Sequence, residues 1–150
     1  MYSRILVTLE NSSADETILS HVRKLVDFCK ASVVFIHVAD GWSARYGEAL
    51  EMRESEEMRE DRAYLERRRA DFVALGIRAE AVLAGGDPAK EIVAAAEREQ
   101  ADLIAMATHG HGFVNDLIRG SVANEVRHLT KIPVLMVRAE RTSGPMGRAN

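Results

Sequence analysis

The residues with the clearest capacity for chemistry follow an apolar stretch at 103–106, which is typical of a strand. Gly110 lies shortly after this stretch, and residues 111–119 separate it from the pair Gly120 and Ser121. A glycine lets the backbone approach an anion closely, and the free N–H groups and dipole at the start of a helix attract negative charge. We therefore predict a phosphate-binding turn that joins this strand to a helix beginning at Gly120 and Ser121.

Histidines flank the first glycine of this turn, at His109 and His111. A zinc site would need a third and a fourth ligand at a usual spacing, and none follows, so no metal site is predicted and both residues are assigned to the loop or the phosphate side. A P-loop hydrolase is not indicated either, because the sequence lacks Gly-x4-Gly-Lys-Ser/Thr. His37 lies within an apolar stretch and is predicted to be a hydrogen-bonded core histidine.

The elements that position the turn follow from hydrophobic periodicity and from turn residues. Cap residues at Asn11, Ser12 and Ser13 begin the first helix, and Asp87 with Pro88 begins a later one. The alternation of strand and helix implies a parallel sheet with helices on both faces. Strands are predicted at 5–9, 33–38, 78–84, 102–106 and 134–137, and helices at 14–30, 58–75, 89–99 and 121–129.

Ligands in such α/β sheets bind beyond the carboxyl ends of the strands, where the strand order reverses. If the first and fourth strands are neighbours at that point, the loop after Leu9 faces the loop after Met106, and the glycine turn lies in the crevice. An acid/base pair of Glu10 and His109 is then allowed geometrically. The chain shows no recognisable nucleophile–base–acid order, so turnover is not required.

The composition narrows the class of protein. The 150 residues carry 20 basic and 23 acidic side chains, a formal charge of −3, which argues against a nucleic-acid partner. Cys29 is the single cysteine, so no internal disulfide is predicted, and a reducing, cytoplasmic location is expected. No apolar run of membrane length and no secretory segment is present. We expect one domain over residues 1–139 and a flexible tail over 140–150.

Two further segments have open interpretations. The run 48–69 is rich in charges of both signs and is interpreted as a solvated helix face that specifies no partner. Trp42 and Tyr46, just before it, either stack on a bound base or cover the core.

The segments 101–110 and 132–137, with the Gly120 and Ser121 turn between them, give the chain a specific resemblance. It resembles the universal stress protein family over roughly residues 3–138. The ATP-binding branch of that family carries a Gly-x2-Gly-x9-Gly-Ser motif, which Gly110, Gly120 and Ser121 match. The resemblance implies an α/β fold with a five-stranded parallel open sheet in the order 3-2-1-4-5, helices on both faces, Rossmann-like and similar to the adenine nucleotide alpha hydrolases.

The resemblance also implies roles for individual residues. Thr8, Leu9 and Glu10 would line the adenine and ribose side, Val38 would contact the base, and Met106 with Ala107 would form the floor. The phosphates of ATP, with or without Mg²⁺, would lie against the remaining motif residues, His109, Gly110, Gly120, Ser121 and Val122.

Two departures from the motif leave the function open. Ala107 replaces the first glycine, which is harmful if that position needs a positive φ and harmless if it needs only a small residue. Glu10 replaces an aspartate, which moves the carboxylate one methylene outward. The first hypothesis is therefore a dimeric universal stress protein that binds ATP as a sensing ligand. The alternatives are a dimeric, non-nucleotide adaptor for a partner protein, and a nucleotide-using enzyme of related fold.

Assembly is expected to use the final strand, which runs from Val134 to Val137. An exposed apolar edge strand is normally paired or covered. In resembling proteins this strand pairs with its twin across a two-fold axis, so a homodimer is expected.

Overall fold

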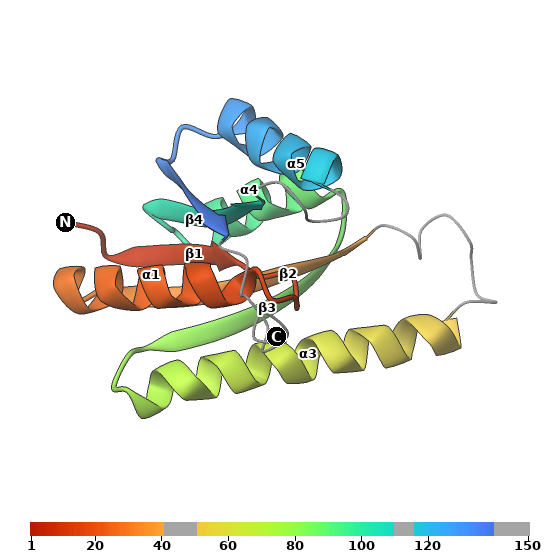
Figure 1. The fold of residues 1–150 in the computed structure, drawn as a ribbon, viewed down its shortest axis with the longest axis horizontal. Coiled ribbons are helices and arrows are strands. Elements are labelled where there is room, and N and C mark those ends of the chain that lie inside the picture. Colours follow the sequence, from red (N-terminus) through yellow and green to blue (C-terminus); the bar gives the residue numbers. More distant parts are fainter. Residues whose placement is uncertain (41–50, 110–115, 140–150) are drawn as a thin grey trace, which may run out of the picture.

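The computed structural model describes residues 1–40, 51–109 and 116–139, and the tail predicted at 140–150 lies outside them. Strands and helices alternate along the described chain (Figure 1). Their bounds are β1 Arg4–Thr8, α1 Asp15–Cys29, β2 Ser32–Asp40, α3 Glu51–Ala74, β3 Ala79–Gly86, α4 Pro88–Arg98, β4 Leu103–His109, α5 Asp116–Leu129 and β5 Val134–Ala139.

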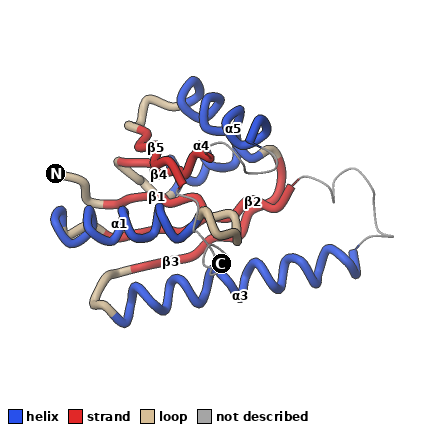
Figure 2. The backbone as a smooth tube through the Cα atoms, viewed as in Figure 1, coloured by secondary structure: helices blue, strands red, loops and turns tan. Residues whose placement is uncertain are grey.

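The strands form one parallel sheet in the order β3-β2-β1-β4-β5, which confirms the predicted fold class and strand order. Figure 2 shows the strands side by side with helices around them. Val7 of β1 pairs with Phe35 of β2 on one side and with Ala105 of β4 on the other. The strand order therefore reverses between β1 and β4.

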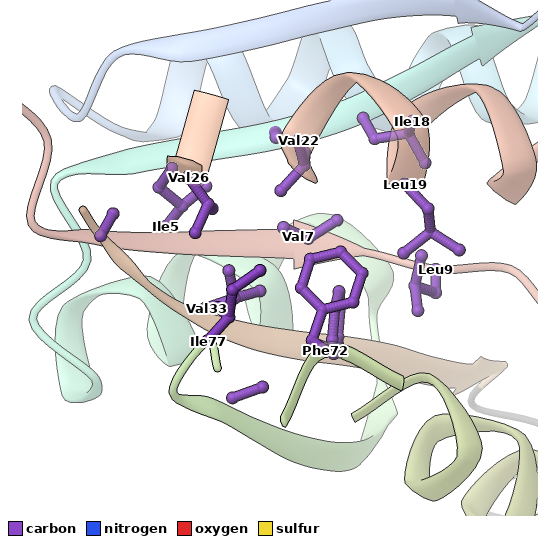
Figure 3. Close-up of a cluster of buried hydrophobic side chains, with 14 of the residues drawn as sticks. Ile5, Val7, Leu9, Ile18, Leu19, Val22, Val26, Val33, Phe72 and Ile77 are labelled. Carbon is purple, nitrogen blue, oxygen red and sulfur yellow. The ribbon is translucent and has the colours of Figure 1, made fainter. Parts of the chain in front are cut away.

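Each face of the sheet packs into its own apolar cluster. On the first face, α1 contacts β4 and β5 and α3 contacts β2 and β3, and the rings of Phe35 and Phe72 meet edge to face with their centroids 4.9 Å apart. Figure 3 shows this cluster, with Val7 and Val22 at its centre. On the second face, α4 and α5 pack against Leu6, Ile104 and their neighbours. Strands buried on both faces are expected to be almost continuously apolar, as β1 and β4 are.

Two helices begin earlier than the sequence predicted. The start of α5 is Asp116, so the prediction that it begins at Gly120 and Ser121 is wrong. A glycine inside a helix costs only about 1 kcal/mol, so it does not by itself set a boundary. The start of α3 is Glu51 instead of residue 58, because its charged first part has no apolar stripe to detect.

The fourth strand ends later than predicted. It continues past Met106 to His109, and Ala107 pairs with Val137 of β5. Ala107 and His109, two of the predicted site residues, are therefore strand residues instead of loop residues. The helices that the structure describes include none long and apolar enough to cross a membrane.

Candidate functional site

The crevice expected in a sheet of this topology lies between the carboxyl ends of β1 and β4. Leu9 and Glu10 leave the sheet directly after β1. Ala107 and His109 form the last part of β4. The chain segments predicted to face each other across the strand reversal therefore do leave the same edge of the sheet.

Four of the predicted site residues lie on the face covered by α4 and α5. Met106 is buried in the apolar cluster of that face, and Val38 and Val122 pack against the cluster. Thr8 has the same orientation as Leu6, because alternate residues of a strand point to the same face. The structure thus brings residues from β1, β2, β4 and α5 to one side of the carboxyl edge.

Two other predicted residues face the opposite side, toward α1 and α3. Leu9 is 2% exposed and Ala107 is 8% exposed, and both belong to the apolar cluster of that face. Leu9 is therefore a core residue whose side chain does not line the site. The methyl group of Ala107 packs within the protein.

Ala107 stands where the motif has a glycine, so it matters whether the backbone there has a positive φ. The non-glycine residues with positive φ in the described part of the chain are Asn11, Lys30 and Gln100. Ala107 is not among them and has ordinary strand geometry. This backbone does not require a glycine at the position.

The phosphate side is described only in part. Gly110 and His111 lie outside the described residues, as do Trp42 and Tyr46, and for His109 and Gly120 the structure describes the backbone alone. Ser121 is exposed and lies in the second turn of α5. The helix N–H groups without an intrahelical acceptor belong to the first turn. Gly120 and Ser121 are therefore not the free helix start that was predicted.

The loop after β1 is organised by a buried carboxylate that the sequence analysis missed. Asp15 is fully buried, and its oxygens accept hydrogen bonds from the backbone N–H of Glu10 at 3.0 Å and of Asn11 at 2.9 Å. The hydroxyl of Tyr64 also donates a hydrogen bond to it, at 2.5 Å.

The residue at the N-cap position of α1 is Ala14, which makes no side-chain cap. The predicted cap residues Asn11, Ser12 and Ser13 therefore do not occupy the N-cap position. The Ser12 hydroxyl accepts a 3.3 Å hydrogen bond from the Ala14 N–H.

The prediction of a hydrogen-bonded histidine in β2 is confirmed. His37 Nδ1 lies 2.8 Å from the carbonyl oxygen of Leu9, and its Nε2 lies 3.2 Å from a carboxylate oxygen of Asp61. A carbonyl oxygen only accepts, so Nδ1 carries a proton and donates. The other oxygen of Asp61 accepts a bond from the side-chain amide of Asn11 at 3.2 Å. One carboxylate of α3 thus contacts both β2 and the loop after β1.

The interpretation of this segment as a solvated helix face is wrong for one edge of α3. Asp61, Tyr64 and Arg68 follow one another at spacings of three and four, which places them on one stripe of the helix. Tyr64 bonds to Asp15, and Arg68 pairs with Glu16 and lies 5.2 Å above the Tyr64 ring. Burial and the hydrogen bond to Asp15 raise the pKa of the Tyr64 phenol.

The chemical groups at this edge are suited to binding. Within the described ranges, no group of three or more histidine, cysteine or acidic side chains could hold a metal ion. The carboxylate of Glu10 accepts a hydrogen bond from the Ser12 hydroxyl at 3.3 Å and is partly exposed. A partly exposed carboxylate beside backbone groups at a strand end can accept hydrogen bonds from the hydroxyls or amines of a ligand.

Comparison with known protein families gives one match that spans nearly all of the chain. The universal stress protein family model matches residues 1–138. A universal stress protein of Thermus aquaticus is 33% identical over 140 residues, which cover 92% of this chain and 100% of the relative. The universal stress protein MJ0577 of Methanocaldococcus jannaschii is 26% identical over 159 residues, which cover 95% of this chain and 98% of the relative.

Solved structures give the same match for the fold. The structure of MJ0577 has a TM-score of 0.82 at 27% identity, over 95% of this chain and 99% of that one. A universal stress protein from Archaeoglobus fulgidus in complex with dAMP has a TM-score of 0.67 at 20% identity, over 91% and 98%. A further universal stress protein structure, in complex with cAMP, has a TM-score of 0.66 at 18% identity, over 93% of this chain and 98% of that one. The last two likenesses concern the fold alone.

Proposed function

The chain belongs to the universal stress protein family, and we propose that it binds ATP as a sensing or regulatory ligand between the carboxyl ends of β1 and β4. The nucleotide acts here as a ligand whose binding changes the state of the protein. No product-forming step is assigned to the site, and slow hydrolysis is not required for the role.

The observation that carries this proposal is the reversal of strand order between β1 and β4, with predicted site residues gathered beside it. Val38 and Met106 supply an apolar wall on one face of the carboxyl edge, and Thr8 has the same orientation. The carboxylate of Glu10 supplies polar atoms next to it, as does the carbonyl oxygen of Leu9, which accepts from His37 and has a second lone pair. An apolar wall with a few polar groups is the usual composition of a small-molecule site.

The choice of an adenine nucleotide is supported by two proteins of the same fold, which were solved with dAMP and with cAMP. Both ligands join adenine to a phosphate, and ATP does the same. In the proposed complex Ala107 lies beneath the base. The conformation and buried methyl group of Ala107 present no obstacle that a glycine would remove.

The phosphates are proposed to lie toward His109, Gly110, Gly120, Ser121 and Val122. Magnesium, where ATP carries it, would be held by the phosphate oxygens. Slow exchange of this ligand, instead of rapid turnover, fits a sensing role.

Two further properties belong to the proposal. The protein is proposed to form a homodimer through β5, which is an edge strand of the sheet. It is proposed to act in the cytoplasm, because its single cysteine, Cys29, is a free thiol and suits a reducing compartment.

A specific observation favours the alternative function, a non-nucleotide adaptor for a partner protein. The helix that was expected to begin at Gly120 and Ser121 begins at Asp116 instead. An anion site at a helix start depends on free N–H groups at those positions. A chain that keeps this arrangement in solution would bind phosphate weakly.

Isothermal titration of Mg-ATP into the purified protein tests the proposal, with Gly120→Val beside it. We expect saturable binding to the wild type and none to the variant, because a branched side chain blocks close approach of the phosphates. Asn124→Val is the matched control, since Asn124 is exposed on the same helix and is expected to leave binding intact. Absence of heat together with absence of competition by AMP or ADP would favour the adaptor.

A further inference from the structure

A polar stripe on α3 contacts the segment that joins β1 to α1. The stripe consists of Asp61, Tyr64 and Arg68, and their partners include Asn11 and Asp15. Figure 1 shows α3 running alongside β3 at the edge of the molecule, at a distance in sequence from β1. Side chains of α3 therefore reach across to the loop that carries the base-side residues of the proposed site.

The backbone of Leu9 is the first point that these contacts fix. The register between β1 and β2 ends with Thr8 opposite Ile36, and the N–H of Leu9 still donates to the Ile36 carbonyl at 2.8 Å. Its own carbonyl accepts from His37 Nδ1 at 2.8 Å. Asp61 contacts the other nitrogen of that ring, which fixes the orientation of the imidazole. Asp61 thus acts on Leu9 through His37.

The second point is the turn at Glu10 and Asn11. Asn11 has a φ of 60°, in the left-handed region that asparagine adopts more readily than most other non-glycine residues. Its side chain donates to Asp61, and its backbone N–H donates to Asp15, which Tyr64 holds from α3. The conformation of this turn is therefore held by contacts from α3 and from the start of α1.

We propose that Asp61 and Tyr64 are positioning residues for nucleotide binding, because they hold residues 9–11 in the geometry that the base side of the site requires. Neither residue contacts the nucleotide in this proposal. The affinity for adenine nucleotide then depends on whether α3 is docked on the loop. The inference rests on the proposed function of the site.

The expected size of the effect follows from the population of the correct loop conformation. The apparent dissociation constant equals the intrinsic constant divided by the fraction of molecules that are competent to bind. If loss of an α3 contact leaves about one molecule in ten with the loop in place, the dissociation constant rises about tenfold. Such a change is easily measured.

Simple electrostatics predicts the opposite sign for one of these residues. ATP is an anion, so removal of the negative charge of Asp61 should strengthen binding if charge alone matters. Glu60 is the adjacent acidic residue and is exposed on α3, so Glu60→Ala removes an equal charge without touching the loop. Asp61→Asn removes the same charge but keeps an oxygen for His37, and its NH₂ group can bond to Asn11 once the Asn11 side-chain amide turns its own oxygen toward it.

The experiment measures Mg-ATP dissociation constants for the wild type, Asp61→Ala, Asp61→Asn, Tyr64→Phe and Glu60→Ala, at a temperature where urea unfolding shows every protein to be fully folded. Amide hydrogen exchange of Glu10 and Asn11 is measured on the same proteins without nucleotide. We expect about tenfold weaker binding and faster exchange for Asp61→Ala and Tyr64→Phe. Asp61→Asn and Glu60→Ala should stay within about twofold of the wild type.

Two other outcomes would overturn the inference in different ways. If the wild type binds Mg-ATP and Asp61→Ala binds it equally well or more tightly, the positioning role is refuted while the proposed function stands. The same holds if Glu60→Ala weakens binding as much as Asp61→Ala does, since the loss would then not depend on the contacts that Asp61 makes with the loop. If the wild type itself does not bind Mg-ATP, the proposed function fails and the positioning role fails with it.

Discussion

The hydroxyl of Tyr64 donates a 2.5 Å hydrogen bond to the buried carboxylate of Asp15. This bond joins the middle of α3 to the first residue of α1, across 49 positions in the sequence. The same carboxylate accepts backbone N–H groups from Glu10 and Asn11. A buried ion is tolerated when its acceptor positions are filled in this way. The conformation of the loop after β1 is therefore held by the hydrogen bonds that Asp15 accepts.

Replacement of Asp15 should destabilise the fold. In Asp15→Asn one of the two acceptor oxygens becomes an NH₂ donor, which would face an N–H of Glu10 or Asn11. We expect the free energy of unfolding to fall by about 2–4 kcal/mol, from lost hydrogen bonds to a charged group and from unpaired donors. Urea denaturation at neutral pH measures the change.

The matched control for this prediction is Asp27→Asn, because Asp27 is exposed on the same helix. Its effect should stay within about 0.5 kcal/mol. Equal effects of the two substitutions would show that the hydrogen bonds of Asp15 do not stabilise the loop.

Alkaline pH should weaken the protein through Tyr64. Burial and the hydrogen bond to Asp15 raise the pKa of this phenol in the folded state above its unfolded value of about 10. Its contribution to stability is therefore complete below a pH of about 10 and is lost as the pH rises from there through the folded pKa. The free energy of unfolding should fall by up to about 1.4 kcal/mol per pH unit above that point because of this one group.

Tyr64→Phe removes this source of pH dependence while it keeps the ring in the core. The other tyrosines and the lysines titrate in both proteins, so the difference between the two curves reports Tyr64 alone. Urea unfolding at a series of pH values from neutral to strongly alkaline gives both curves. Parallel curves would contradict the prediction.

The last residue of β3, Gly86, has a backbone conformation that favours glycine. Gly86 has a φ of +129°, and a Cβ there would lie 3.2 Å from a carboxylate oxygen of Glu91. Gly86→Ala should therefore lower the free energy of unfolding by roughly 1–3 kcal/mol through strain at a position that favours glycine. Thermal or urea unfolding measures the loss.

The neighbouring glycine supplies a control with the same chemical change. A Cβ on Gly85 would meet nothing within 4 Å. Gly85→Ala should leave stability unchanged or raise it by up to about 1 kcal/mol, because alanine restricts the unfolded chain. An equal loss in both variants would remove the special role given to the backbone of Gly86.

Hydrophobic period and turn residues were sufficient to predict the alternation of strands and helices and the two-sided core, because the buried strands are nearly continuous apolar runs, whereas the strand order came from the family resemblance. They placed the helix start wrongly at Gly120, because a glycine followed by serine looks like a cap whether or not the helix has already begun. His37 was predicted correctly as a hydrogen-bonded residue, but it is only partly buried, and its partner Asp61 was not predicted. Local spacing contains no information about which distant charge on α3 comes to lie beside a strand end.

The edge of β5 provides the last prediction. The N–H of Ile104 in β4 donates to the carbonyl of Pro133 at 3.0 Å, so the backbone groups of Pro133, and of every second residue after it, point toward β4. Met136 lies between two such residues, so its backbone N–H points to the open edge of the sheet. Met136 is 41% exposed. If two copies pair through this edge, Met136→Pro should remove one main-chain donor at the interface and produce a monomer.

The choice of Met136 keeps this test specific to assembly. A proline at an outward-facing position of an edge strand leaves the bonds to β4 in place, so the monomer should remain folded. Met136→Val keeps the N–H and suits a strand, and it should remain a dimer. Size-exclusion chromatography with light scattering at micromolar concentration gives the mass of each. A wild type that elutes as a monomer, or a proline variant that stays a dimer, would place the interface elsewhere or exclude it, because only main-chain pairing at this edge makes the two substitutions differ.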